Sequence, residues 1–118
     1  MTDSKLTPKL LAILEWCQRN PTRRRREPLA GGLVITAYID HTGLLHLLLS
    51  RKGVVGPSDQ ECATVLDHWP TSCKVPAAAR QWTRFPRGAF QCAVTIWRPG
   101  IETSRQLKLG ATYSDIEP

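Results

Sequence analysis

The chain has 118 residues, of which 42% are hydrophobic and 22% charged, so one globular domain is expected rather than a disordered chain. No apolar run approaches the roughly 18 residues of a membrane span, and residues 1–10 lack the features of a secretory signal, so a cytoplasmic location is expected. The formal net charge of +6 favours contact with a polyanion or an acidic protein surface.

Residues 7–19 are predicted to form a helix. Thr7 is a suitable N-cap, Pro8 is suited to the first turn, and apolar residues then recur at helical spacing. Pro21 ends the helix, because proline disfavours helical geometry in the residue before it.

Four consecutive arginines follow this helix, between Pro21 and Pro28. Residues 1–56 carry nine Lys or Arg against four Asp or Glu, whereas residues 57–118 carry seven against six, so the run explains most of the charge excess. Because the run lies between the predicted helix and the strands predicted next, we expect a tethered loop, which the flanking prolines stiffen. Such a loop could hold a phosphate backbone, hold an acidic protein patch, or simply be solvated.

A β-hairpin is predicted next, with strands at 33–39 and 44–50 joined by turn residues. Because the second strand is apolar at nearly every position, we expect it to be central and covered on both faces.

The clearest local signal follows at residues 58–69. Ser58 and Glu61 fit a capping box, and Pro70 marks the end of the helix. The apolar stripe at i, i+3, i+4 and i+7 consists of Cys62, Val65, Leu66 and Trp69.

Residues 71–88 show no clear period, whereas 89–97 alternate as in a strand and 101–109 are predicted to pair back on it. The alternation places Phe90, Cys92, Val94 and Ile96 on one face. The predicted fold is α+β: a four-stranded, possibly five-stranded, antiparallel sheet with two helices on one face, in the order α-β-β-α-β-β. Residues 1–110 form the expected single domain, and 111–118 a polar tail.

A second basic segment interleaves arginine with aromatic residues at positions 80–87. Cationic groups and aromatic stacking together hold single-stranded nucleic acids without sequence preference. The alternative is that Trp82 and Phe85 belong to the core and their arginine neighbours are solvated. The candidate nucleic-acid-binding residues are Arg19, Arg23, Arg24, Arg25, Arg26, Arg80, Trp82, Arg84 and Arg87.

Metal and catalytic sites have little support. Cys62, His68 and Cys73 lack the spacing of a zinc clip, and Cys62 and His68 would point to different faces of a helix. No nucleophile or nucleotide-binding motif is present. We therefore expect no metal, no cofactor and no catalytic residue. The expected reduced thiols are Cys17, Cys62, Cys73 and Cys92.

The sequence thus predicts a small, non-enzymatic nucleic-acid-binding protein that contacts the phosphate backbone of DNA or RNA through its arginine-rich loop. The alternative is an accessory or inhibitor subunit that docks on a larger protein or ribonucleoprotein complex. The run LLSRKGVVGPSDQE at 48–61 resembles small phage or mobile-element proteins, although no residue set in it carries a function across.

Overall fold

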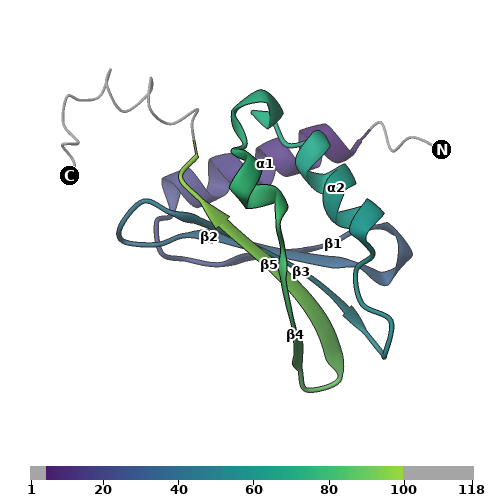
Figure 1. Ribbon diagram of the computed structural model, residues 1–118. Coiled ribbons are helices and arrows are strands. Elements are labelled where there is room, and N and C mark those ends of the chain that lie inside the picture. Colours follow the sequence, from purple (N-terminus) through teal and green to yellow (C-terminus); the bar gives the residue numbers. More distant parts are fainter. Residues whose placement is uncertain (1–4, 100–118) are drawn as a thin grey trace, which may run out of the picture.

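The computed structural model describes residues 5–99, which form two helices and a five-stranded antiparallel sheet. The helices are α1 (Leu6–Arg19) and α2 (Asp59–Asp67), and the strands are β1 (Arg25–Pro28), β2 (Val34–Ile39), β3 (Leu45–Lys52), β4 (Thr83–Arg87) and β5 (Phe90–Trp97). The strands lie in the order β1-β2-β3-β5-β4, and both helices lie on one side of the sheet (Figure 1). None of the helices in residues 5–99 is both long enough and apolar enough to cross a membrane.

The predicted α+β fold is confirmed, and the observed order is α-β-β-β-α-β-β. Two strands appear where none was predicted, β1 in the arginine run and β4 in the segment without a clear period. The predicted strand at 101–109 and the polar tail lie outside the described residues.

The prediction of a loop is wrong for Arg25 and Arg26, which pair with Ala37 and Thr36 of β2. Local preference does not favour a strand here, because the segment is charged and ends in proline. The chain leaving α1 nevertheless runs back along β2, whose outer backbone groups need hydrogen-bond partners. Tertiary context therefore overrides the local signal.

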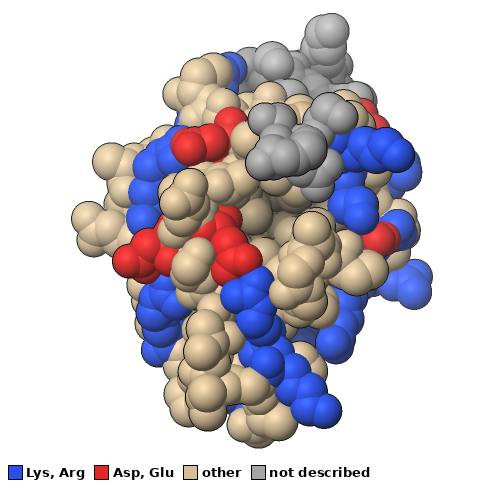
Figure 2. Space-filling view, turned by 90° about the vertical axis from the view of Figure 1, so that its right-hand side faces the viewer, with Lys and Arg blue, Asp and Glu red and all other residues tan. Residues whose placement is uncertain are grey.

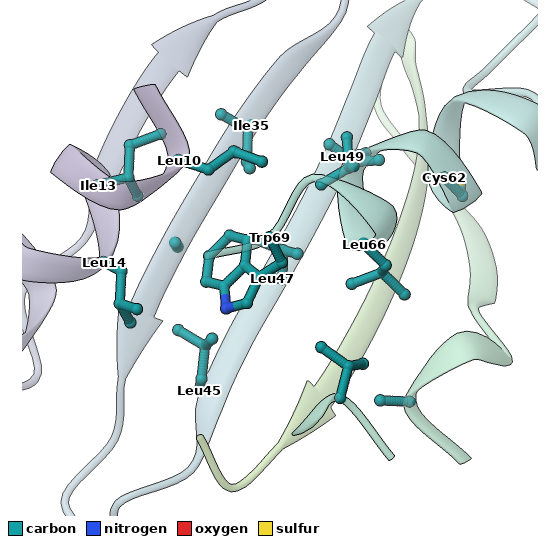
Figure 3. Close-up of a cluster of buried hydrophobic side chains, with 14 of the residues drawn as sticks. Leu10, Ile13, Leu14, Ile35, Leu45, Leu47, Leu49, Cys62, Leu66 and Trp69 are labelled. Carbon is teal, nitrogen blue, oxygen red and sulfur yellow. The ribbon is translucent and has the colours of Figure 1, made fainter. Parts of the chain in front are cut away.

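The hydrophobic core lies between the helices and the sheet. Trp69, which follows α2, is 2% exposed and packs edge-on against Trp97 of β5, with ring centroids 5.7 Å apart. Figure 3 shows side chains of α1, α2, β2 and β3 converging on the indole of Trp69. They include Leu10, Ile13, Leu14, Ile35, Leu45, Leu47, Leu49 and Leu66.

The start of α2 is capped as predicted. The Ser58 hydroxyl accepts from the Glu61 backbone N–H at 3.0 Å, and the Glu61 carboxylate accepts from the Ser58 N–H at 2.8 Å. The Glu61 carboxylate also binds the guanidinium of Arg51 on β3. The cap therefore fastens the helix to the sheet as well as closing its first turn.

Side-chain alternation divides the strand residues between two faces. Leu45, Leu47 and Leu49 are fully buried beneath the helices, so the side chains between them point to the opposite side of the sheet. Strand pairing carries this assignment across the sheet, because directly opposite residues share a face. We call the side away from the helices the open face. It comprises Arg26, Pro28, Val34, Thr36, Tyr38, His46, Leu48, Ser50, Lys52, Thr83, Phe85, Arg87, Phe90, Cys92, Val94 and Ile96.

Within residues 5–99 no helix or strand covers the open face (Figure 1). The central position of β3 is confirmed. On its open face Ser50 is buried, whereas His46 and Leu48 are half-buried. The predicted alternation of β5 is confirmed, with its apolar row on the open face. Both edge strands contain a proline, Pro28 in β1 and Pro86 in β4.

Leu47→Ala is expected to lower the free energy of unfolding by about 2–5 kcal/mol, because it leaves a cavity between the sheet and the helices. The control Leu11→Ala, at a side chain 38% exposed on α1, is expected to cost less than about 1 kcal/mol. Denaturant titration followed by circular dichroism measures both changes. Equal losses would contradict the placement of Leu47 in the core.

Candidate nucleic-acid interface

The arginine run is split between the two sides of the sheet. Arg25 points to the helix side, where its guanidinium lies 5.5 Å from the ring centroid of Trp16 and forms an ion pair with Glu27 at 2.5 Å. Arg24 lies on the opposite side, 5.0 Å from the ring centroid of Tyr38. Arg26 is exposed opposite Thr36 on the open face. Two of the four arginines thus lie on the open face, Arg26 by the alternation of β1 and Arg24 by its contact with Tyr38.

Tyr38 and His46 form the first aromatic group of the open face. Their rings are stacked, with centroids 4.3 Å apart and an interplanar angle of 14°. Because Arg24 lies towards β1 and His46 lies on β3, the Tyr38 ring stands between a cation and an imidazole. The resulting basic and aromatic group (Arg24, Arg26, Tyr38 and His46) is called the β1 corner below.

Asp40 holds this corner in place. Its Oδ2 lies 2.7 Å from His46 Nε2, while its Oδ1 accepts from the backbone N–H groups of Thr42 at 2.8 Å and Leu44 at 3.0 Å. Burial opposes ionisation, but the hydrogen bonds from Thr42, His46 and Leu44 hold the pKa of Asp40 well below its usual range. One carboxylate therefore fixes both the β2–β3 turn and the His46 ring.

A second basic and aromatic group lies at the other end of the open face. Arg87 is opposite Phe90, and Phe90 is opposite Lys52, so the ring stands in a row between two cationic side chains. Arg87 and Lys52 are exposed, whereas Phe90 is half-buried. We call these three residues the β4 corner.

The surface between the two corners is mainly apolar. Most of its side chains are half-buried, but Ser50 and Cys92 are buried, and Ile96 is 45% exposed. No strand position of the open face holds Asp or Glu, and Asp40 at its margin is bound to His46. The apolar side chains are Val34, Leu48, Phe85, Val94 and Ile96.

The arginines on the helix side are instead neutralised by carboxylates. Arg80 pairs with Asp67 at 3.0 Å, and Arg84 pairs with Asp59 at 2.6 Å, so both are tied to α2. In Figure 2, acidic side chains lie close to basic ones in the middle of the view, whereas the charged side chains in its lowest part are all basic. The carboxylates that pair with Arg80 and Arg84 thus belong to α2, and the lowest part of this view shows none.

The predicted site residues do not form one surface. Arg80, Trp82 and Arg84 line a shallow groove of about 200 Å³ against α2, and Trp82 packs on the core. Arg19 and Arg23 are exposed before β1. The open face brings together Arg24, Arg26 and Arg87 and adds Lys52, Tyr38, His46 and Phe90, which were not predicted.

The omitted residues had a signal in the sequence. The apolar alternation of 89–97 identified the row that contains Phe90, and Lys52 lies in the same row once the β3–β5 register is known. Which side of the sheet this row occupies depends on where the helices pack, and periodicity alone cannot supply that.

The cysteines show no sign of a reactive site. Cys17, Cys62 and Cys92 are buried and Cys73 is exposed, all as free thiols. Burial raises the pKa of Cys17 to about 11, and burial likewise raises the pKa of Cys62, so both thiols stay protonated at neutral pH. In the described part of the chain, no three His, Cys, Asp or Glu side chains are grouped to hold a metal ion.

No protein-family model, curated protein or solved structure matches this chain.

Asp40→Asn is expected to destabilise the protein by about 1.5–3 kcal/mol at pH 7, because charge-assisted hydrogen bonds are lost. The folded-state pKa of Asp40 lies below its unfolded value of about 3.9, so the ionised carboxylate stabilises the fold above that pH. The stability gap between wild type and variant should therefore narrow as the pH falls below about 4. Urea titrations across this range measure the gap, and a gap independent of pH would contradict the assigned role.

Proposed function

We propose that this protein is a non-enzymatic nucleic-acid-binding protein that contacts the phosphate backbone through the open face. The observation that carries the proposal is the distribution of basic and acidic side chains between the two faces of the sheet. Arg24, Arg26, Lys52 and Arg87 share a face whose strand positions hold no carboxylate.

The free cationic groups matter more than the total charge. An arginine already bound to a carboxylate must break that pair before it can bind a phosphate, so the arginines facing α2 are poor candidates. Arg26, Lys52 and Arg87 are exposed and have no carboxylate partner among residues 5–99. Arg24 lies on the Tyr38 ring, which leaves the edge of its guanidinium available to an anion.

Binding of this kind has a recognisable dependence on salt. Each phosphate neutralised by Lys or Arg releases condensed counterions, so the logarithm of the affinity falls linearly with the logarithm of the salt concentration. The slope counts the phosphates contacted, and a base-independent interface should bind different sequences with similar affinity.

The double substitution Arg24→Ala and Arg26→Ala is expected to weaken binding to every nucleic acid tested and to reduce the salt slope by about 1.4–1.8. Both side chains are exposed, so the fold should be retained. Fluorescence anisotropy with labelled single-stranded and duplex DNA and RNA, at salt concentrations between about 50 and about 200 mM, measures the affinity and the slope.

The matched control is Lys74→Ala with Arg80→Ala. It also removes two positive charges, but from exposed positions outside the open face. It should leave the slope unchanged. The proposal fails if no nucleic acid binds at about 50 mM salt, or if the control weakens binding as much as the open-face variant does.

A further inference from the structure

The open face carries its two basic corners at diagonally opposite positions. Arg24 and Arg26 lie along the β1 edge, whereas Arg87 lies on β4, at the opposite edge. Along β5, the row of Phe90 and the row of Ile96 are six residues apart, which corresponds to about 20 Å. A ligand that binds both corners must therefore cross the apolar surface between them.

The chemistry of that surface selects the form of nucleic acid. Half-buried Leu48 and Val94 and the more exposed Ile96 offer apolar contacts but no free charge. A duplex presents phosphates and sugars outward and keeps its bases stacked inside, so its exterior has little to offer apolar side chains. The bases of a single strand are free to contact them.

The shape of the open face points the same way. A helix or a free two-stranded ribbon can enter the major groove. Within residues 5–99 no helix lies on the open face, and β4 and β5, which extend furthest from the helices in Figure 1, are joined to the sheet because β5 pairs with β3 along its length. A flexible single strand needs no groove-entering element, because it can lie across a sheet and direct its bases inward.

The two corners differ in the aromatic surface that they offer. At the β1 corner the Tyr38 ring already lies between Arg24 and His46, so its faces are occupied. At the β4 corner Phe90 lies between Lys52 and Arg87, so a stacked base would place its phosphates next to two cations. Of the two corners, the β4 corner is therefore the one at which a base can stack, on Phe90.

Building on the proposed function, we infer that the ligand is a single-stranded nucleic acid that crosses the open face diagonally from the β1 corner to the β4 corner. Its phosphates contact Arg24 and Arg26 at one end and Lys52 and Arg87 at the other. A base stacks on Phe90, and the bases between the corners lie on the apolar surface.

The test compares a labelled single strand of mixed sequence with the duplex of the same length, using the full chain. The single strand should bind at least about 10-fold more tightly at equal salt. Phe90→Ala should weaken single-strand binding by about 5- to 150-fold, the range measured for loss of one base–aromatic stack, and should leave duplex binding within about 2-fold.

Two further variants test whether a loss of affinity comes from lost stacking, from a disturbed fold or from a general loss of apolar surface. Phe90→Leu keeps an apolar side chain but removes the aromatic face, so it should also weaken single-strand binding while the unfolding midpoint is retained. Leu11→Ala removes exposed apolar surface from α1 and should change neither affinity.

The outcomes distinguish this inference from the proposed function. If the duplex binds as tightly as the single strand, or if Phe90→Leu and Phe90→Ala leave single-strand binding unchanged, the inference is overturned, even where the Arg24 and Arg26 variant still weakens binding. If Phe90→Ala instead disrupts self-association in sedimentation and leaves nucleic-acid binding intact, a second copy occupies the open face and the inference is likewise overturned. Absence of binding to any nucleic acid contradicts the proposed function itself.

Discussion

Packing of both helices against one face of the sheet is the constraint on which the charge distribution of this protein depends. The core formed around Trp69 fixes which side of each strand is buried. The direction of each arginine within a strand then follows from strand alternation. Arg25, Arg51 and Arg84 turn towards the helices, where Glu27, Glu61 and Asp59 meet them. Arg24, Arg26 and Arg87 turn away from the helices, towards a surface without carboxylates on its strands. A basic run in the sequence thus becomes two chemically different groups.

The sequence contains most of what determines the helices and the central strands. Ser58 and Glu61 mark the start of α2, and Pro70 lies just beyond its end at Asp67. The number of leucines in β3 indicates a central strand. The edge strands could not be predicted in this way. Arg25 to Pro28 lacks β-branched residues and periodicity, and it becomes a strand because β2 needs a partner on its outer side. Pairing between distant segments is a property of the whole fold, and local patterns do not report it.

The candidate site shows the same limit. The sequence suggested one basic and aromatic surface formed by Arg80, Trp82 and Arg84, and these residues do line one groove. However, Asp67 pairs with Arg80 and Asp59 pairs with Arg84, and both acids belong to α2. These acids are distant in sequence from the arginines, so their effect cannot be read from the segment itself. Conversely, the apolar row of β5 was recognised correctly, and only the packing of the helices places it on the uncovered side. The sequence shows the chemistry of each residue, but it does not show which residues become neighbours in the folded protein.

The prolines of the two edge strands have a consequence for how this molecule meets others. Pro28 and Pro86 each remove a backbone donor from a border of the sheet, with Arg26 two residues before Pro28 and Arg87 directly after Pro86. Such borders resist extension by a further strand, which is the usual route by which exposed sheets polymerise. A binding partner would therefore contact the side chains of the open face rather than the backbone groups of the edge strands. A sheet protected in this way can keep apolar groups in contact with solvent without offering them a template for aggregation.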